Sequence, residues 1–338
     1  MSKEPIILAI ESSCDDTSAA ILRGKTVLSN IIANQEIHKK YGGVVPELAS
    51  REHQKNIIPV VDTAIKEAKV KKADINAIAF TKGPGLLGSL LVGGSFAKAF
   101  ALGMNIPLIT VNHMQAHVLA LFISQNTSNP KFPFLCLTVS GGHTQIIHVM
   151  DYHNMKVIGT TLDDAAGEAF DKSAKLLNLE YPGGPLIDKY AKKGNINAFT
   201  FGKPKVKDLN FSFSGLKTSI LYSIQKHEKT HPNFIKENLN DLCASIQHSI
   251  VSILLEKIKK AIDQKNISNI GIAGGVSANS YLRAKIKELA LQKKIKVHIP
   301  NFEYCTDNAA MIGIAGYFKY LNKDFAEQNE TSSARLRF

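Results

Sequence analysis

Residues 6–22 read IILAIESSCDDTSAAIL, and this stretch decides the fold class. The apolar run Ile6–Ile10 predicts a short buried strand, and the hydroxyl- and carboxylate-rich residues after it predict a turn. Thr17–Leu22 then predicts a second strand, so the stretch indicates a β-hairpin. A third strand is expected near Val27–Ala33.

The same plan returns in the second half of the chain. Residues 134–149 read FLCLTVSGGHTQIIHV, which again predicts a strand at Phe134–Val139, a polar turn and a second strand at Thr144–Val149. Aligning Ser140 with Ser12 places a third strand, Lys156–Thr160, at the matching offset. The repeat predicts two related lobes instead of two unrelated domains.

Strands and helices alternate around these hairpins. In the first half we expect a helix from about Pro46, a strand at Ala77–Thr81, a turn at Gly83–Gly85, a helix at Leu87–Leu102, a strand at Ile106–Val111 and a helix at Asn112–Ser124 with Asn112 as N-cap. In the second half we expect a helix at Gly167–Leu177, a turn at Tyr181–Pro185, a helix at Leu239–Asp263, a strand at Ile270–Ala273, a helix at Asn279–Leu291, a strand at Ile295–Ile299 and a last helix at Asp307–Tyr320. This alternation predicts an α/β fold with mixed sheets.

The boundaries follow from this pattern and from composition. Residues 1–130 form the expected amino-terminal lobe and residues 131–325 the carboxyl-terminal lobe, and the last helix can pack back on the first lobe. A polar stretch, 125–133, connects the two, and residues 326–338 form a polar tail that we expect to be frayed.

Composition excludes several classes of protein. Of the 338 residues, 44% are hydrophobic and 21% charged, which is typical of a globular chain and excludes general disorder. The longest apolar stretch, Gly83–Ala97, is shorter than the roughly 20 residues of a membrane span. The run at Ile6–Ile10 is too short for a signal peptide and acids follow it. We therefore expect no membrane association and a cytoplasmic location.

The four cysteines lie far apart, which excludes a disulfide framework and a Cys-based zinc site. The net charge of +12 favours a polyanionic partner, and basic segments occur at Lys203–Lys207 and Lys285–Lys296. The alternative is that these lysines only confer solubility.

Two histidines, His113 and His117, are four residues apart at the start of an expected helix. Both imidazoles then lie on one helix face and can reach one metal ion. Met114 occupies the position of the general-base glutamate in zinc proteases of the H-E-x-x-H type, so that mechanism lacks its base. Asp307 is the best candidate for a third ligand, and this donor set suits Zn or Fe. The alternatives are an ordinary histidine pair and an ordinary capping carboxylate.

Glycine pairs recur where strands are expected to end, at 83–85, 141–142, 183–184 and 274–275. Such turns expose backbone N–H groups that suit phosphate, and two lobes with facing polar turns make a nucleotide-sized cleft. Asp171 and Asp188 lie close to these turns in sequence and are candidates for hydrogen bonds to ribose hydroxyls. Tight connections and a solvated acidic helix face are the alternatives. Covalent catalysis is disfavoured, because no Ser-His-Asp order or reactive cysteine is evident.

The chain resembles one known family over nearly its whole length. The motifs that carry the resemblance are Ile10–Thr17 (IESSCDDT), Gly83–Leu86 (GPGL), Asn112–His117 (NHMQAH), Val139–Thr144 (VSGGHT), Phe213–Lys217 (FSGLK), Gly274–Asn279 (GGVSAN) and Asp307–Ala310 (DNAA). The family is that of the tRNA N6-adenosine threonylcarbamoyltransferases, earlier described as O-sialoglycoprotein endopeptidases. The resemblance implies the two-lobed fold of actin, sugar kinases and heat-shock chaperones. It also implies transfer of a threonylcarbamoyl group from threonylcarbamoyl-adenylate to N6 of adenosine 37, in tRNAs that read codons beginning with A.

The resemblance further implies which residues form the site. One divalent metal ion, with Fe favoured over Zn, would be held by His113, His117 and Asp307. The residues that would hold the adenylate are Thr138, Val139, Ser140, Gly141, Gly142, Asp171, Gly184, Asp188 and Asn279. Many relatives have Glu at the position of Gln115, which argues further against a protease mechanism. An inactive paralogue of the same fold and a small ATPase are the implied protein partners.

Two other functions remain as alternatives at this stage. One is a metallopeptidase, which only the histidine pair supports. The other is a non-catalytic actin-like scaffold, which would bind adenylate without turnover.

Overall fold

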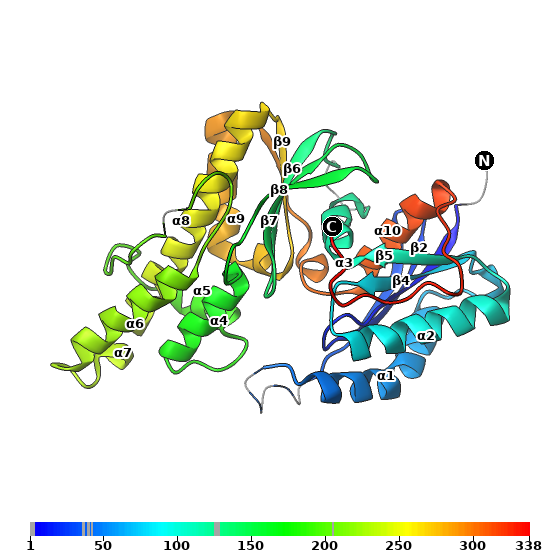
Figure 1. The fold of residues 1–338 in the computed structure, drawn as a ribbon, viewed down its shortest axis with the longest axis horizontal. Coiled ribbons are helices and arrows are strands. Elements are labelled where there is room, and N and C mark those ends of the chain that lie inside the picture. The colour runs from blue at the N-terminus through cyan, green and yellow to red at the C-terminus, as the bar shows by residue number, and fades with distance from the viewer. Residues whose placement is uncertain (1–3, 36–37, 39–40, 42, 125–128, 205) are drawn as a thin grey trace. The chain divides into compact units, whose positions relative to one another are not determined.

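The computed structural model describes residues 4–35, 38, 41, 43–124, 129–204 and 206–338. The chain divides into two compact units (Figure 1). Unit 1 consists of Met1–Asn129 together with Pro300–Phe338, and unit 2 consists of Pro130–Ile299. The segment 300–325, which the sequence assigned to the second lobe, thus belongs to unit 1. The reason is that the last helix packs on the sheet of unit 1. The sequence analysis allowed for this arrangement of the last helix.

Unit 1 contains a five-stranded mixed sheet in the order β3-β2-β1-β4-β5. Strands β1 (Ile6–Glu11), β2 (Thr17–Arg23) and β3 (Thr26–Ala33) form the antiparallel part, with Ile6 opposite Arg23. Strands β4 (Ala77–Gly83) and β5 (Leu108–Asn112) continue it in parallel with β1. The hairpin predicted from residues 6–22 is confirmed.

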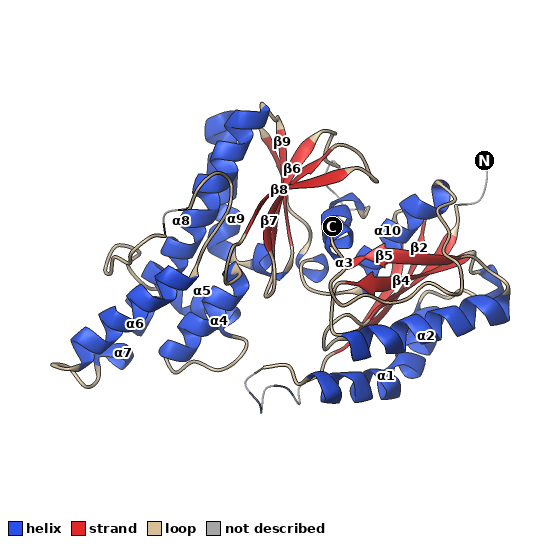
Figure 2. Cartoon of the chain, viewed as in Figure 1, coloured by secondary structure: helices blue, strands red, loops and turns tan. Residues whose placement is uncertain are grey.

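Helices cover both faces of this sheet (Figure 2). Helices α1 (Pro46–Glu67) and α2 (Leu87–Met104) pack together on one face, and α10 (Ala309–Leu321) packs on the other. The alternation of strand β1 explains this, because Leu8 and Ile10 join the α1/α2 core whereas Ile7 lies against Gly316 of α10. The shorter elements of unit 1 are α3 (His113–Leu119) and the 3₁₀ turns η2 (Lys72–Asp74), η3 (Ala120–Phe122) and η5 (Phe302–Tyr304).

Among the described residues, α2 is the one helix with the length and composition of a membrane span, with a mean hydropathy of 1.4. It packs against β4 and α1. Sheet-covering helices of this composition occur in proteins without membrane segments, so a single such helix is weak evidence for a span.

Unit 2 repeats the sheet of unit 1, strand for strand. Its order is β10-β9-β6-β7-β8, with the same antiparallel and parallel pairings. The strands are β6 (Phe134–Val139), β7 (Thr144–Val149), β8 (Met155–Thr160), β9 (Asn269–Ala273) and β10 (Lys296–His298). The predicted relationship between the two lobes is therefore confirmed at the level of topology.

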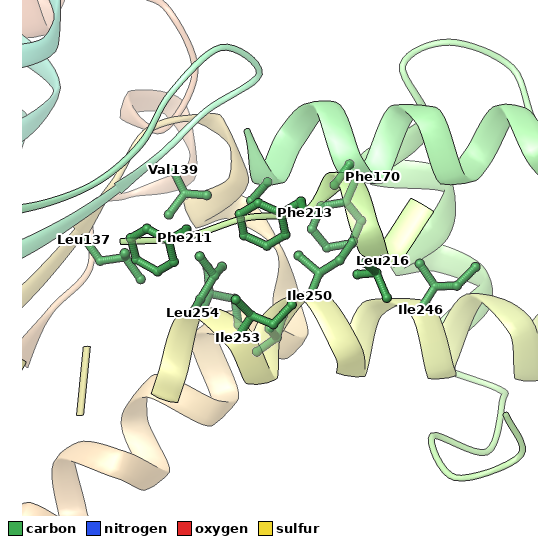
Figure 3. Close-up of a cluster of buried hydrophobic side chains, with 14 of the residues drawn as sticks. Leu137, Val139, Phe170, Phe211, Phe213, Leu216, Ile246, Ile250, Ile253 and Leu254 are labelled. Atoms are coloured by element: carbon green, nitrogen blue, oxygen red, sulfur yellow. The ribbon is translucent and has the colours of Figure 1, made fainter. Parts of the chain in front are cut away.

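The helices of unit 2 enclose a large apolar core. They are α4 (Ala166–Leu176), α5 (Gly183–Ala191), α6 (Ser214–Glu228), α7 (Phe234–Glu237), α8 (Leu239–Lys265) and α9 (Ser280–Lys293), with the 3₁₀ turn η4 (Gly275–Ala278). Phe211 and Phe213, from the segment before α6, lie between strand β6 and Ile250 and Leu254 of α8 (Figure 3). This core fixes the ends of β6 and β9, where the glycine turns lie.

Four local expectations were wrong. The helix expected at Asn112–Ser124 is shorter, because α3 ends at Leu119 and the 3₁₀ turn η3 follows it. The turn expected at Tyr181–Pro185 contains the start of α5, because the Asp171 carboxylate accepts hydrogen bonds from the N–H groups of Gly183 and Gly184 and caps the helix. The last helix starts at Ala309 instead of Asp307, because Asn308 is its N-cap.

The tail is the fourth, because residues 326–338 are not frayed. Ala326 forms a β-bridge with Leu108, and the backbone N–H of Ser333 donates to the carbonyl of Lys82 at 2.8 Å. Further contacts anchor the residues beyond Ser333. The polar composition predicted fraying, but hydrogen bonds of its backbone groups can keep a polar tail ordered on the surface.

Candidate metal centre and nucleotide-binding turns

The histidine pair is positioned by the junction of β5 and α3. The side-chain oxygen of Asn112 accepts hydrogen bonds from the backbone N–H groups of Met114 at 2.9 Å and Gln115 at 3.2 Å, so the predicted N-cap is confirmed. The helix therefore begins at His113, one turn before His117. The two rings lie edge to face with centroids 4.7 Å apart.

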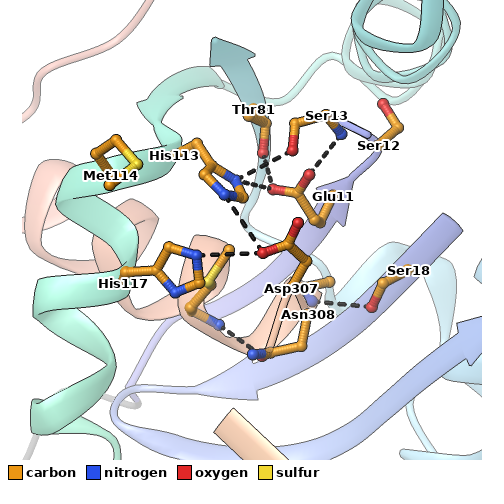
Figure 4. A network of polar contacts seen from close by, with 12 residues as sticks. Glu11, Ser12, Ser13, Ser18, Thr81, His113, Met114, His117, Asp307 and Asn308 are labelled. Carbon is orange, nitrogen blue, oxygen red and sulfur yellow. Dashed lines mark hydrogen bonds and ion pairs between the residues drawn. The ribbon is translucent and has the colours of Figure 1, made fainter. Parts of the chain in front are cut away.

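Asp307 completes this group from the other end of the chain (Figure 4). Its Oδ1 atom lies 3.4 Å from Nε2 of His113 and 3.2 Å from Nε2 of His117. The three potential ligand atoms all lie within 4.8 Å of one another. The histidines are buried, whereas the Asp307 side chain is 33% exposed, so the group is open on one side. The structure thus brings together the three residues that the sequence analysis named.

A fourth residue, Glu11, was missed by the sequence analysis. It ends strand β1 and is 1% exposed. Its Oε2 atom lies 3.0 Å from Nδ1 of His113 and accepts a hydrogen bond from the Thr81 hydroxyl at 2.6 Å, while Oε1 accepts from the backbone N–H of Ser13 at 2.5 Å. The one signal in the sequence was a carboxylate directly after five apolar strand residues.

The charges of this group are strongly coupled. Burial alone would lower the pKa of His113, but the carboxylates of Glu11 and Asp307 outweigh it and hold that pKa well above its usual range. Burial likewise would raise the pKa of Asp307, but His113 and His117 hold it well below its usual range. Burial would also raise the pKa of Glu11, but the charge of His113 and the hydrogen bonds from His113 and Ser13 lower it. The buried carboxylate of Glu11 and the partly exposed carboxylate of Asp307 place negative charge around the imidazoles, which favours a cation.

The donor set fits a divalent metal ion. The Nε2 atoms of His113 and His117 lie 3.4 and 3.2 Å from Oδ1 of Asp307, close enough for one ion to reach all three, and two imidazoles with a carboxylate suit Zn and Fe. Glu11 accepts from the Nδ1 side of His113, which leaves Nε2 of that ring as the ligand atom. Within the described residues, Nδ1 of His117 is buried without a hydrogen-bond partner. The His117 interactions are therefore concentrated on the Nε2 side, which faces Asp307.

The turn between β1 and β2 lies beside this group. Burial, with added repulsion from Asp15 and Asp307, raises the pKa of Asp16 to about 7. The same causes raise the pKa of the Cys14 thiol well above its usual range. A thiol held protonated is a poor nucleophile, in agreement with the expectation that catalysis is not covalent.

The proposed nucleotide residues of β6 lie in the matching turn of unit 2. Thr138 and Val139 end the strand, and Ser140, Gly141 and Gly142 lead into β7. A Cβ atom at Gly141 or Gly142 would meet nothing within 4 Å, so space is open beside these backbone groups.

The neighbouring segments close tightly against this turn. Gly167, at the start of α4, donates its N–H to the carbonyl of Ser140 at 3.2 Å, and a Cβ there would lie 2.5 Å from that oxygen. A Cβ at Gly274, which follows β9, would lie 2.5 Å from the Val139 carbonyl. The carboxyl ends of β6 and β9 and the start of α4 therefore meet at this turn.

The other proposed nucleotide residues already have protein partners. Asp171 caps α5 through Gly183 and Gly184, so that pair lies at a helix start and not at a strand end as expected. Asp188 of α5 accepts from the Ser280 hydroxyl at 2.8 Å. Asn279 caps α9 and donates to Gln247 at 2.7 Å. These contacts link α4, α5 and α9 within unit 2, and the roles of the residues toward a ligand remain predictions.

The two basic segments differ in what their lysines contact. Lys203 and Lys207 are exposed, and residue 205 lies outside the described part of the chain. Lys285 pairs with Glu288 at 2.7 Å and Lys293 with Asp263 at 2.5 Å. Partial neutralisation weakens the second segment as a polyanion site.

Proteins of different functions have solved structures with this fold. The chain is similar to full-length HypF in its phosphate- and nucleotide-bound form, with a TM-score of 0.61 and 13% identity over 95% of this chain and 47% of that one. It is also similar to the ROK hexokinase from Thermus thermophilus, with a TM-score of 0.50 and 13% identity over 94% and 99% of the two chains. The expected fold of actin and the sugar kinases is confirmed.

Sequence comparison is more specific. The family model described as tRNA N6-adenosine threonylcarbamoyltransferase matches residues 26–314. Curated proteins of that name are 60% identical in Christiangramia forsetii, over the full length of both chains, and 58% identical in Riemerella anatipestifer, over 98% of both. The chain belongs to the family of the tRNA N6-adenosine threonylcarbamoyltransferases.

Proposed function

We propose that this chain transfers a threonylcarbamoyl group to N6 of adenosine in tRNA. The observation that carries the proposal is the 60% identity, from end to end, with a curated tRNA N6-adenosine threonylcarbamoyltransferase. The donor is threonylcarbamoyl-adenylate, the acceptor is adenosine 37 of tRNAs that read codons beginning with A, and AMP is released. A metallopeptidase is not favoured, because Met114 occupies the place of the general base.

The reaction depends more on the positioning of the donor and the acceptor than on a nucleophilic side chain. The donor is a mixed anhydride of a carbamic and a phosphoric acid, so it is already activated. N6 attacks the carbamoyl carbon, the bond from that carbon to the phosphate oxygen breaks, and N6 loses a proton. Holding N6 close to the carbon supplies much of the acceleration. The raised pKa of Cys14 agrees with a mechanism without a covalent intermediate.

His113, His117 and Asp307 would hold one Fe or Zn ion, of which the family resemblance favours Fe. When bound, such an ion supplies Lewis-acid stabilisation of negative charge and a fixed point for orienting the transferred group. Glu11 orients His113 by accepting from Nδ1, at 3.0 Å. The exposed side of Asp307 leaves the group accessible to a substrate.

The turn at the end of β6 would hold the adenylate. The open space beside Gly141 and Gly142 allows a phosphate to approach their backbone N–H groups, which also stabilise the charge that develops on departing AMP. Thr138, Val139 and Ser140 line the same strand end, and Gly184 with Asp188 and Asn279 would lie toward the nucleoside. Asp171 and Asp188 each retain lone pairs that can accept hydrogen bonds from ribose hydroxyls.

Partners and location complete the proposal. The family resemblance assigns an inactive paralogue of the same fold and a small ATPase as protein partners, and we expect the protein to act in the cytoplasm. The net charge of +12 agrees with tRNA as the substrate.

Mass spectrometry of tRNA nucleosides tests the proposal. The purified chain is incubated with threonylcarbamoyl-adenylate and an unmodified tRNA transcript that carries adenosine 37, with and without the paralogue and the ATPase. We expect threonylcarbamoyladenosine in the wild-type reaction. Asp307→Ala and a transcript with guanosine at position 37 should give none. Adenylate binding without product in every combination would instead indicate a scaffold.

A further inference from the structure

The last residues of the chain form an ordered segment of unit 1. Residues 330–338, here called the C-terminal strap, cross the carboxyl ends of β4 and β5 and end beside α3 (Figure 1). The N–H of Ser333 donates to the carbonyl of Lys82 at 2.8 Å, and the N–H of Gly85 donates to the carbonyl of Ala334 at 3.2 Å. The strap is thus held mainly by its backbone.

Two glycines, Gly83 and Gly94, allow the strap to approach the rest of unit 1 closely. A Cβ at Gly83 would lie 1.9 Å from the Ser333 carbonyl oxygen, and φ there is +152°. A Cβ at Gly94 of α2 would lie 3.1 Å from the Ser332 hydroxyl. Glycine at these two positions lets the strap approach closely. The strap therefore packs directly against the end of β4 and against α2.

The last four residues of the strap alternate in exposure. Leu336 is half-buried, with its Cβ 3.2 Å from the position of a Cβ at Gly83. Arg335 and Arg337 on either side of it are exposed. Within the described residues, neither guanidinium group has an ion-pair or hydrogen-bond partner. Two adjacent cationic side chains are therefore presented to solvent.

Acidic groups do not neutralise this charge. The Glu330 carboxylate pairs with Lys82 at 2.6 Å, and the Glu330 carbonyl accepts a hydrogen bond from Lys98. Glu330 is the one acidic side chain of the strap, and its pairing with Lys82 leaves it unavailable to the two arginines.

Asn112 connects the strap to the candidate metal centre. Its Nδ2 donates to the Arg337 carbonyl at 2.9 Å, while its Oδ1 caps α3. The next residue, His113, is the first proposed ligand. This hydrogen bond holds the backbone of Arg337 beside α3, the helix that carries both histidines, and Arg335 lies two residues before it.

We propose that the C-terminal strap is an RNA contact, in which Arg335 and Arg337 bind phosphates next to the target adenosine. This inference rests on the proposed function, because an adenosine that reaches the metal group must bring its flanking backbone to the neighbouring surface. Guanidinium groups match phosphate geometry in two-point contacts, and phosphate contacts set the position of an RNA without reading its sequence.

The test measures binding of an unmodified tRNA and of its isolated anticodon stem-loop to the full chain, between about 50 and 200 mM salt. The variant is Arg335→Gln with Arg337→Gln. Affinity scales with salt to the power of about −0.7 for each phosphate contacted in a single strand, so each lost contact costs about 5-fold at about 0.1 M salt. We expect affinity for both RNAs to fall by about 25-fold and the slope to become shallower by about 1.4.

Two controls accompany this variant. Arg335→Lys with Arg337→Lys keeps the charge and should retain most of the salt slope. Lys71→Gln with Lys72→Gln makes the same change of charge at exposed residues before β4, at the opposite end of that strand from the strap, and should leave both quantities unchanged. Melting temperature and metal content should equal those of the wild type in all three variants, because the four side chains are exposed.

The outcomes separate this inference from the proposed function. Wild-type affinity and slope in the glutamine variant would overturn the role of the strap, as would a loss seen with whole tRNA but not with the stem-loop. If either of these results is found and the wild type still forms threonylcarbamoyladenosine, the proposed function stands. A shallower slope in the variant, combined with no product from the wild type, would support the RNA contact and overturn the activity.

Discussion

Glu11 sets the chemistry of the metal group at the scale of single residues. Its buried carboxylate accepts hydrogen bonds from Thr81 and Ser13 and lies against Nδ1 of His113. A carboxylate in this place fixes the imidazole tautomer and makes the opposite nitrogen a better ligand. The residue thus acts through His113, as a positioning residue.

We therefore expect Glu11→Ala to lower metal affinity by about 10- to 100-fold, and Glu11→Gln to lower it less because the amide oxygen can still accept from Nδ1. Competition with a chromophoric chelator measures the affinity, and elemental analysis measures the metal content. Glu67→Ala, at an exposed position of α1, is the control and should bind like the wild type. A folded Glu11→Ala protein with unchanged affinity would contradict the positioning role.

Asp16 makes stability depend on pH. Burial first, and then Asp15 and Asp307, raise its pKa to about 7, against about 3.9 in an unfolded chain. Between these values the folded state keeps a proton that the unfolded state releases, so this group makes the protein less stable as pH rises from about 4 to 7. Asp16→Asn cannot ionise. In the metal-free protein it should raise the melting temperature more at pH 8 than at pH 5, as measured by scanning calorimetry.

A bound cation changes this expectation in a defined direction. Positive charge next to Asp307 lowers the pKa of Asp16, so the pH dependence of the variant's gain should shrink when metal is added. Glu67→Gln serves as the control. An equal gain at both pH values in the metal-free protein would show that Asp16 is not the group responsible.

The sequence predicted those site residues whose relationship is local or carried by a motif. His113 and His117 follow from a spacing of four on one helix, and Asn112 follows from the N-cap rule. Asp307 could be named, but its helix starts two residues later than expected. Glu11 could not be found, because its contact with His113 spans 102 residues and depends on the parallel strands that bring β1 beside β4.

Elements were predictable where periodicity is strong and turns are local. The predicted strands at Phe134–Val139 and Thr144–Val149 have the bounds found in the structure. Helix α5 was missed, because Gly-Gly-Pro is typical of a turn and the cap comes from Asp171, 12 residues away. The order of the C-terminal strap was missed as well, since its stability comes from backbone pairing with β4 and not from its own composition.

The strap gives a prediction at the scale of an element. Gly83→Ala places a methyl group 1.9 Å from the Ser333 carbonyl at φ of +152°, so the strap or strand β4 must shift. We expect the free energy of unfolding to fall by about 1 to 3 kcal/mol. Denaturant titration measures it, and hydrogen exchange should show lower protection in residues 330–338.

Gly103→Ala is the matched control. This glycine lies near the end of α2, and a Cβ there would meet nothing within 4 Å. The substitution should raise the free energy of unfolding by about 0.5 to 1 kcal/mol, because alanine favours the helix. Equal effects of the two substitutions would mean that the contact with the strap has no energetic consequence.

At the scale of the whole molecule, the two ends of the chain build one unit. Helix α10 covers strands β1, β2 and β4, and its buried residues include Met311, Ile314 and Phe318. Unit 2, Pro130–Ile299, is inserted between the two parts of unit 1. The repeat in the sequence indicated two lobes with related sheets, but which lobe receives the last helix depends on packing that the repeat does not encode.

The metal group ties these two parts together. His113 and His117 come from the part of unit 1 before the insertion, whereas Asp307 comes from the part after it. All three proposed ligands belong to unit 1, so the free energy of metal binding at this group would stabilise unit 1 against separation of its parts. At a free metal concentration of about 100 times the dissociation constant, this stabilisation is about 2.7 kcal/mol.

Removal of the metal should therefore act on one unit only. Hydrogen exchange of the full chain, followed by peptide mass spectrometry with and without a chelator, should show lower protection in α3, α10 and strand β1 after chelation. Peptides from unit 2, such as those of α8, should exchange at the same rate in both conditions. His117→Ala should give the chelated pattern without a chelator and should not respond to added metal. A loss of protection spread over both units, or confined to unit 2, would place the metal elsewhere than on His113, His117 and Asp307.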